Sequence, residues 1–350
     1  MESKAYEYMD WPRIEAIVYG EEASPKDVMA PRLTTDGVLV QGFFPEADKA
    51  EVLVGSRKYE MEKEDEAGYF AAMIPGRKIP EYEYRVTRGE EVQEFSDPYA
   101  FAGQITEAEE KAFCAGVYYH AYEKLGAHPM EINGVKGTSF AVWAPNAVRV
   151  SVVGNFNEWD GRRHAMHRMP MSGIFELFIP GVKVGDIYKY ELKLKGNRIE
   201  LKSDPYAACT EVPPAGASVV ADTGAFQWED EEWMAGRKKF GDRKQPISIY
   251  ETSLTDWKDG EELVEFVKKL NYTHVELHPV MEYLDDEAGE YSTFAYYAPT
   301  RRFGMPQDFQ KTVNELHKAE IGLILDWTPS HFPRVEGGLE LFDGTPLYEN

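Results

Sequence analysis

An internal repeat is the feature that most limits what this chain can fold into. Residues 37–100 contain GVLVQGFF, AEVLVG, GYFAAMIPG, YEYRV and SDPYA, and residues 138–207 contain TSFAVW, VRVSVVG, GIFELFIPG, YKYEL and SDPYA in the same order. Each copy alternates apolar and polar residues between turn signals spaced about 8–12 residues apart, which is typical of an Ig-like sandwich. Because there are only two copies, about one hundred residues apart, they indicate tandem domains rather than a solenoid. The repeat predicts two β-sandwiches in series.

The length of 350 residues exceeds what one ordinary core accommodates and indicates two or three domains. We expect an N-terminal β-sandwich over residues 1–103, opened by a short helix that Asp10 caps, and a second sandwich over 137–222. Linkers are expected at 104–136, where Ala108–Phe113 can form a helical turn, and at 223–245. A third domain is expected over 246–350.

Strands and helices alternate in the third region. Short apolar runs at 247–250, 274–278 and 321–325 predict strands, and the segments after Glu261 and Pro306 predict helices with one apolar face. Such alternation calls for a parallel sheet or barrel, with ligand chemistry at the carboxyl ends of the strands. The run Ile321–Leu325 ends abruptly at Asp326, and His331 follows after a Trp-Thr-Pro-Ser turn.

Composition excludes several classes of function. With 61 acidic and 38 basic residues and a net charge of -23, the chain would repel nucleic acid and anionic membranes, so a neutral ligand fits better. Cys114 and Cys209 are far apart and give neither a disulfide framework nor a metal spacing, which favours a reducing cytoplasm. The sequence has no signal-peptide run and no apolar stretch approaching about 20 residues, so neither export nor a membrane anchor is expected.

Five segments resemble bacterial 1,4-α-glucan (glycogen) branching enzymes of the α-amylase superfamily. They are SFAVWAPNAVRVSVVGNFNEWDGRRHAM, THVELHPVMEY, YYAPTRRFGMPQDF, GLILDWTPSHFP and LFDGTPLYEN. The resemblance implies N-terminal β-sandwich modules, the second similar to a carbohydrate-binding module, followed by a (β/α)8 catalytic barrel. Since a full barrel takes about 250 residues, this chain would contain only the first three β/α units.

The implied activity is transfer of an α-1,4-glucan segment to a 6-hydroxyl, forming α-1,6 branches in glycogen. The mechanism is retaining double displacement, in which a nucleophilic carboxylate lies about 5–5.5 Å from an acid/base carboxyl. The family's catalytic carboxylates follow barrel strands four, five and seven and are expected after Asn350, so this chain alone is predicted to be inactive. The resemblance implies no metal or organic cofactor and an α-glucan as partner. We expect a cytoplasmic protein, from the cysteine content, and a monomer.

The resemblance assigns substrate-binding roles to three residues. Asp326 and His331 would contact the glucosyl ring that is cleaved, and Tyr291 would stack on the same ring. From spacing alone, a strand-end Asp can instead cap a turn, and an isolated His can be a packing residue. In the second sandwich, Trp143 and Trp159 are candidate glucan platforms. Trp143 lies in an alternating strand, which favours the core, whereas Trp159 lies in the NFNEWDG turn, where burial and exposure both remain open.

The chain departs from the family pattern in three places. The usual Trp-Gly-Tyr-Gln is replaced by Gly289, Glu290, Tyr291 and Ser292; a usual His is Ser253; and Met305 stands where a Thr commonly caps the next helix. The acidic run Asp285–Glu290 would be a solvated loop rather than a catalytic pair.

Two other functions remain open. One is a non-catalytic glucan-binding protein with a vestigial barrel. The other is a different member of the superfamily, such as a debranching or trehalose-releasing enzyme, against which the ending FDGTPLYEN argues.

Overall fold

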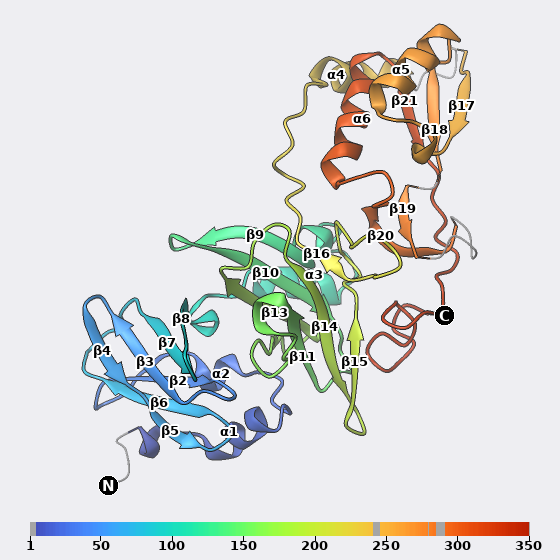
Figure 1. Ribbon diagram of the computed structural model, residues 1–350. Coiled ribbons are helices and arrows are strands. Elements are labelled where there is room, and N and C mark those ends of the chain that lie inside the picture. The colour runs from blue at the N-terminus through green and yellow to red at the C-terminus, as the bar shows by residue number, and fades with distance from the viewer. Residues whose placement is uncertain (1–4, 241–245, 279, 285–290, 350) are drawn as a thin grey trace. The chain divides into compact units, whose positions relative to one another are not determined.

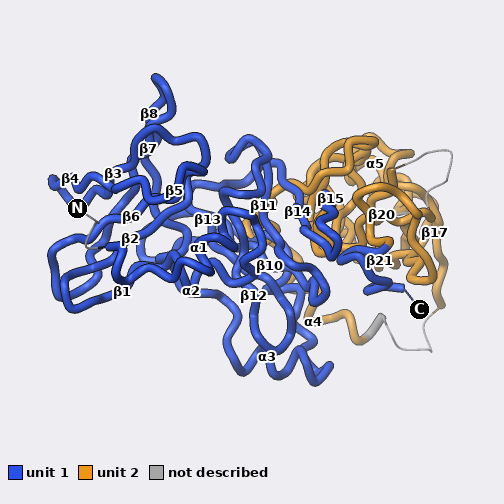
Figure 2. Tube along the Cα trace, turned by 90° about the horizontal axis from the view of Figure 1, so that it is seen from below, with its two compact units in different colours: residues 1–202, 341–350 blue, residues 203–340 orange. Residues whose placement is uncertain are grey.

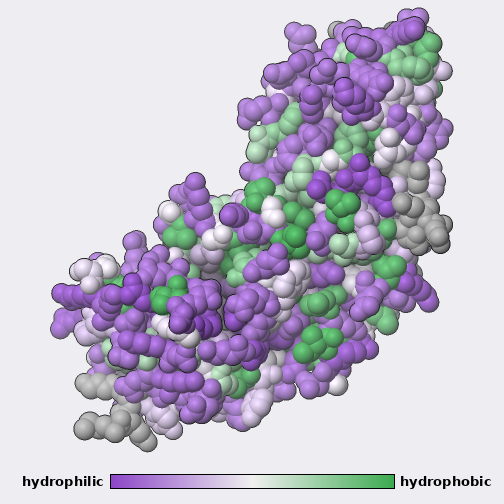
Figure 3. All heavy atoms as spheres, in the orientation of Figure 1, coloured by the Kyte–Doolittle hydropathy of each residue, from purple (hydrophilic) through white to green (hydrophobic). Residues whose placement is uncertain are grey.

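The computed structural model describes residues 5–240, 246–278, 280–284 and 291–349. The chain divides into two compact units, one formed by residues 1–202 and 341–350 and the other by residues 203–340 (Figures 1 and 2). Charged and polar side chains cover most of the face seen in Figure 3, where apolar residues appear as small separate areas, in keeping with the acidic composition.

Two antiparallel sheets form the first half of unit 1. One has the order β1 (Arg32–Leu33), β2 (Val38–Phe43), β6 (Tyr69–Ile74), β5 (Glu62–Asp65), and the other β4 (Arg57–Glu60), β3 (Lys49–Val54), β7 (Glu83–Arg88), β8 (Glu91–Ser96). Side chains from both sheets share one core that includes Val40, Val52 and Tyr84. The alternation seen in the sequence therefore builds a two-layer β structure.

The second repeat forms another pair of sheets. Their orders are β12 (His167–Arg168), β13 (Ile174–Pro180), β10 (Val135–Trp143), β9 (Gly126–Ile132), and β11 (Arg149–Gly154), β14 (Ile187–Leu194), β15 (Arg198–Lys202). Three strand pairs of the first copy have counterparts in the second. The pair β2–β6 corresponds to β10–β13, β3–β7 to β11–β14, and β7–β8 to β14–β15. Even the SDPYA turns match, since Asp97 accepts from the Tyr99 N–H at 2.9 Å and Asp204 from the Tyr206 N–H at 2.8 Å.

The stretch that sequence reasoning treats as a linker contains structure that belongs to the second sandwich. Strand β9 lies within residues 104–136 and pairs with β10 as an edge strand. Its sequence, GAHPMEI, lacks alternation and contains a proline, which only an edge tolerates. Glu110 of the linker helix is 2% exposed and accepts from the Ser172 N–H and Oγ at 2.9 Å. Burial of this carboxylate ties the linker to the sandwich.

The short helices of unit 1 begin at residues that cap them. Helix α1 (Trp11–Val18) begins after Asp10, whose carboxylate accepts from the Arg13 N–H at 3.4 Å, as predicted. Helix α3 (Glu107–Cys114) has a capping box between Thr106 and Glu109. The remaining helical turns of unit 1 are η1 (Tyr6–Tyr8), α2 (Lys26–Met29), η2 (Pro98–Ala100), η3 (Ala121–Glu123) and η4 (Asn155–Asn157).

Unit 2 contains the predicted parallel sheet. Strands β17 (Ile249–Thr252), β18 (His274–Leu277) and β21 (Gly322–Leu325) pair in parallel in that order. Helices α5 (Gly260–Lys269) and α6 (Pro306–Lys318) pack against it through a core that includes Leu263, Val267 and Leu316 (Figure 1). Asn271 adopts the left-handed conformation at φ 60° after α5, and Leu270 at the end of this helix is 49% exposed.

An antiparallel pair that sequence reasoning missed lies between β18 and α6. Strands β19 (Met281–Tyr283) and β20 (Thr293–Pro299) pair with a register irregularity around Glu282. The other elements of unit 2 are β16 (Ser218–Val219), α4 (Glu231–Phe240) and η5 (Leu254–Asp256).

Candidate functional site

The carboxyl ends of the three parallel strands lie level with one another. The register pairs Thr252 with Leu277 and Leu277 with Leu325, so the residues that follow each strand reach the same edge. Two backbone bonds extend the ladder beyond the strands: the His278 N–H donates to the Thr252 carbonyl at 3.2 Å, and the Asp326 N–H to the Leu277 carbonyl at 3.0 Å. The backbone therefore fixes His278 and Asp326 at neighbouring positions of this edge.

Asp326 and His331 lie on the segment that leaves β21. Asp326 is half-buried, whereas His331 is exposed and its Nδ1 lies 2.8 Å from the Ser330 hydroxyl oxygen. The main chain at His331 is anchored, because its carbonyl accepts from the Tyr296 hydroxyl at 2.8 Å. Among the residues that the structure describes, no hydrogen bond or ion pair joins Asp326 to His331. Among the described residues, the two side chains therefore lack the direct hydrogen bond that couples a nucleophile to its base.

Tyr291 lies beside a histidine that sequence reasoning did not single out. Its ring is 45% exposed and runs parallel to the ring of His278, with centroids 6.5 Å apart and an interplanar angle of 12°. His278 Nε2 also lies 3.7 Å from a carboxylate oxygen of Glu251 at the end of β17. The sequence signal that could have identified His278 is its place as the first polar residue after strand β18, equivalent to Asp326 after β21.

Two departures from the family pattern have structural consequences. Ser253 caps the turn η5, since its Oγ accepts from the Thr255 N–H at 3.3 Å and its own N–H donates to Asp256 at 3.3 Å. Met305 provides no side-chain cap for α6, but its N–H donates to the carboxylate of Asp308 at 2.7 Å. The acidic run Asp285–Glu290, with Gly289, lies outside the described residues.

A buried carboxylate organises the β19–β20 pair. Glu282 is fully buried and forms an ion pair with Arg302 at 2.9 Å. It also accepts from the hydroxyls of Thr210 and Thr300 at 3.1 Å and from the Arg301 N–H at 2.6 Å. The guanidinium of Arg302 lies over the ring of Tyr283, with its Cζ 3.8 Å from the ring centroid. Because its polar groups are paired, this network holds β19 in place. Tyr291 lies two residues before β20, the strand that pairs with β19.

The two tryptophans of the second sandwich have different environments. Trp143 is half-buried, its indole N–H donates to the Ser172 carbonyl at 2.9 Å, and its ring packs edge-on to Phe113 at 5.6 Å. These contacts are compatible with a packing role for Trp143, which stays a prediction. Trp159 is 37% exposed, and its indole N–H donates to Asn155 at 2.8 Å.

The turn that carries Trp159 has an unusual backbone. Glu158 and Trp159 are consecutive non-glycine residues in the left-handed region, with φ of 58° and 61°. Asn157 supports this turn, because its Oδ1 accepts from the Gly154 N–H at 2.9 Å and its Nδ2 donates to the Val152 carbonyl at 2.8 Å. A held, exposed aromatic ring is the kind of surface on which a sugar ring stacks.

The described residues contain no group of three or more side chains that could hold a metal ion. Likewise, none of the helices within the described ranges has the length and apolarity that a bilayer crossing requires.

Comparisons with known proteins agree with the repeat and with the motifs. A family model described as alpha-1,4-glucan branching enzyme GlgB, N-terminal domain, matches residues 10–99, and one described as carbohydrate-binding module 48 (isoamylase N-terminal domain) matches residues 124–207. A pullulanase structure from Anoxybacillus sp. LM18-11 is similar over 87% of this chain and 47% of its own, at 19% identity and a TM-score of 0.44, which is too distant to support an argument.

Curated relatives are similar over almost the whole chain. The 1,4-alpha-glucan branching enzyme GlgB of Cereibacter sphaeroides is 42% identical over 359 residues, covering 99% of this chain and 49% of the relative. The enzymes of that name from Saccharophagus degradans and Rubrobacter xylanophilus are 39% and 42% identical, covering 96% of this chain and 49% and 48% of theirs. The chain spans about half the length of the curated relatives it matches. It therefore belongs to the 1,4-alpha-glucan branching enzyme family, whose N-terminal portion it matches.

Proposed function

We propose that this chain is the N-terminal, glucan-binding portion of a 1,4-α-glucan branching enzyme, which transfers an α-1,4-glucan segment to a 6-hydroxyl to make α-1,6 branches. The observation that carries the proposal is the similarity of 99% of the chain to about half of a branching enzyme at 42% identity. The match of residues 124–207 to a carbohydrate-binding module supports α-glucan as the ligand.

The proposed domains follow the sequence boundaries apart from β9, whereas the compact units of the fold group residues 203–222 with unit 2 and residues 341–350 with unit 1. Residues 1–103 form the first sandwich, the second runs to residue 222 and gains strand β9 at its start, and 223–245 form a linker. Residues 246–350 form the first three β/α units of a (β/α)8 barrel, a proposal supported by the parallel order of β17, β18 and β21. The proposed protein is a monomer and is located in the cytoplasm.

The proposed site contributes sugar contacts rather than the transfer chemistry. Asp326 and His331 bond the hydroxyls of the ring being cleaved, and Tyr291 stacks on its face. Support comes from the placement of Asp326 at the sheet edge and from the exposure of Tyr291 and His331. The carboxylates that form and resolve the glucosyl intermediate are assigned by the resemblance to positions after Asn350.

Binding and branching by the 350-residue chain test this proposal separately. In native gels containing glycogen or amylose, the chain should migrate more slowly than in a polysaccharide-free gel or a dextran gel. Incubation with amylose should leave the iodine colour unchanged and form no new α-1,6 linkages. Unretarded migration would contradict the binding role, and loss of colour with new branches would contradict the assignment of the chemistry to residues outside this chain.

A further inference from the structure

A cavity of about 380 Å³ lies between the two sandwiches within unit 1, and none of its lining residues belongs to the strand ends described above. Its first wall comes from β7, β8 and the SDPYA turn, and its second from the turn after β11 and the end of β13. The volume falls within the range of about 300–1,000 Å³ that small-molecule sites occupy. Aromatic side chains line both walls, namely Phe44, Tyr84, Phe95, Tyr99 and Phe156.

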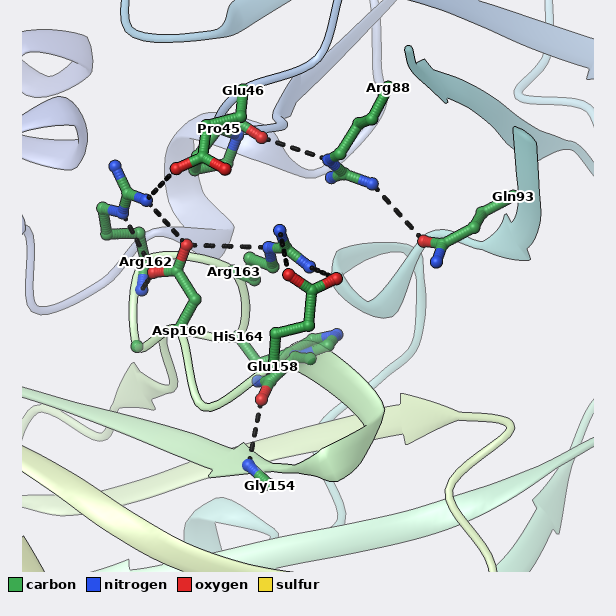
Figure 4. A network of polar contacts seen from close by, with 12 residues as sticks. Pro45, Glu46, Arg88, Gln93, Gly154, Glu158, Asp160, Arg162, Arg163 and His164 are labelled. Carbon is green, nitrogen blue, oxygen red and sulfur yellow. Dashed lines mark hydrogen bonds and ion pairs between the residues drawn. The ribbon is translucent and has the colours of Figure 1, made fainter. Parts of the chain in front are cut away.

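Arginines from both sandwiches meet at this cavity (Figure 4). Arg88 ends strand β7, and Arg163 lies on the turn after β11; the guanidiniums of both reach toward the same space. Arg163 pairs with Glu158 at 3.2 Å and lies 3.6 Å from Asp160. Burial, and after it the positive charge of Arg163, lowers the pKa of Arg88. The two arginines are therefore close enough to repel each other.

The acidic side chains around the cavity are already engaged. Asp160 pairs with Arg162 at 2.8 Å, and Arg162 also holds Glu46 at 3.3 Å. Glu94 accepts from Arg85 at 2.6 Å. Asp97 is fully enclosed and accepts from the hydroxyls of Tyr82 at 2.5 Å and Tyr84 at 3.2 Å.

Arg88 is left with neutral partners. Its Nε donates to the Pro45 carbonyl at 3.2 Å and its Nη1 to the amide oxygen of Gln93 at 3.4 Å, which engages two of its five N–H groups. Within the described part of the chain, no carboxylate lies at ion-pair distance from Arg88. In a chain of net charge -23, a half-buried arginine beside a second arginine and without a carboxylate is a site for an external anion.

The other side chains that line the cavity could contact a sugar ring attached to the anion. His164 lines the second wall, and burial lowers its pKa to about 4, so its ring is neutral at physiological pH. Its Nδ1 faces the Asn157 amide nitrogen at 2.9 Å, which places the proton of the neutral ring on Nε2 as a donor. Aromatic faces and neutral amide and imidazole groups are what sugar rings and their hydroxyls contact. We propose that this cavity binds a phosphate monoester of a small sugar, with the phosphate held between Arg88 and Arg163.

Glu158 acts as the internal competitor for this ligand. Its carboxylate occupies Arg163 at 3.2 and 3.4 Å although the side chain is 63% exposed. A bound phosphate would displace it, and Glu158 directly precedes Trp159 in the left-handed turn. Ligand binding would therefore alter the support of the exposed ring of Trp159, which connects the cavity to the proposed glucan platform. The binding proposal itself does not rest on the proposed branching function.

Calorimetric titration of the 350-residue chain with glucose 6-phosphate, AMP, inorganic phosphate and glucose tests the proposal. We expect saturable one-to-one binding of glucose 6-phosphate, with weaker binding of inorganic phosphate and none of glucose. Arg88→Gln should weaken binding about tenfold or more, because charge-assisted hydrogen bonds are lost. Arg57→Gln is the matched control, since it removes the same charge from an exposed position of the same sandwich and should leave binding unchanged.

Two further variants keep the test decisive if Arg88→Gln does not fold. Gln93→Glu gives Arg88 an internal carboxylate and should also weaken binding, whereas Glu158→Gln frees Arg163 and should tighten binding several-fold. Preference for AMP over glucose 6-phosphate would support the phosphate monoester and reassign its body to a nucleoside. The proposal is overturned by no saturable binding of either ester, by equal binding of inorganic phosphate, by equal effects of the Arg88 and Arg57 variants, or by competition from maltoheptaose.

Discussion

Asp343 binds Asn146, which lies 197 residues earlier in the chain. One oxygen of its carboxylate accepts from the Asn146 main-chain N–H at 2.9 Å and from the Asn146 side-chain amide at 3.0 Å. The other oxygen accepts from the Thr345 hydroxyl at 2.6 Å, and Asp343 is only 1% exposed. This bond attaches the FDGTPLYE segment to the second sandwich, next to the half-buried Trp143, whose ring meets that of Tyr348 at 6.3 Å.

Replacing Asp343 should release this segment. Asp343→Ala removes the charged acceptor of the Asn146 main-chain and side-chain amides, at a cost of about 1.5–3 kcal/mol. We expect a lower melting temperature and faster proteolysis of residues 341–349 than in the unaltered chain. Glu131→Gln, an exposed change in the same sandwich, is the control and should have no effect. Unchanged proteolysis in Asp343→Ala would contradict the role of this bond.

A hydroxyl at the start of α6 should stabilise unit 2. The Asp308 carboxylate already accepts from the N–H of Met305, so Met305→Thr would supply the missing half of a capping box. The gain should be about 1 kcal/mol in the free energy of unfolding. Urea denaturation followed by the helical circular dichroism signal measures it. A lower midpoint would show that the packing of the Met305 side chain contributes more than the cap.

The ion pair between Arg302 and Glu282 should be costly to break. Arg302→Met leaves a fully buried carboxylate without its cation, which should cost about 3–5 kcal/mol. The double variant Arg302→Met/Glu282→Gln should recover part of this loss, because no charge then remains buried. Lys318→Met breaks an exposed pair with Glu229 and should leave the denaturation midpoint almost unchanged, because solvent screens this pair. Equal denaturation midpoints for the two single variants would contradict the prediction.

Two titrating groups at the inter-sandwich cavity should act on stability in opposite directions. Burial raises the pKa of Asp97 from 3.8 to about 6, so the folded state binds a proton at Asp97 more readily than the unfolded state does. The stabilisation that this proton gives the folded state is lost as pH rises from 3.8 to about 6. Burial lowers the pKa of His164 from 6.5 to about 4, so its contribution is lost as pH falls from 6.5 toward 4.

Asp97→Asn removes the pH-dependent contribution of Asp97 to stability and leaves that of His164. Between pH 6.5 and 4, the melting temperature of this variant should therefore fall more steeply than that of the unaltered chain, whereas that of His164→Gln should fall less steeply. Parallel pH profiles for all three proteins would disprove the two opposed contributions.

Trp159 should contribute to glucan binding, and Trp143 to packing. Trp159→Ala removes an exposed ring whose stacking is worth about 0.5–1.5 kcal/mol, so affinity for glycogen should fall several-fold without a change in melting temperature. Trp228→Ala removes a ring of similar exposure, 43% against 37%, from unit 2 and is the control. Trp143→Ala should lower the melting temperature, since its indole N–H is bonded to Ser172. Equal glycogen affinities for the Trp159 and Trp228 variants would contradict the platform role.

The elements that sequence analysis anticipated depend on local signals. Alternating residues predicted β2, β6, β10 and β13, and Asp10 marked the start of α1. Strand β9 and the β19–β20 pair were missed because β9 lacks alternation and because β19 is only three residues long. Their stability comes from partners rather than from their own pattern.

The site was anticipated only in part for the same reason. The change from apolar residues to Asp326 after a strand is visible in the sequence, but the adjacency of His278 to Tyr291 depends on the β19–β20 pair. A glutamate within VMEYL would be expected at the surface, but Glu282 is buried. The hydroxyls of Thr210 and Thr300 and the guanidinium of Arg302 offset the cost of burying its charge.

The sequence by itself determined the tandem repeat, the strand-helix alternation and the caps, because these follow from side-chain periodicity and from hydrogen bonds within a few residues. The tertiary structure decided which charges are buried and paired. Asp343 meets Asn146, and Arg88 meets Arg163 at a shared cavity, only after distant segments have packed. Desolvation and pairing energies depend on that packing, and no local pattern encodes them.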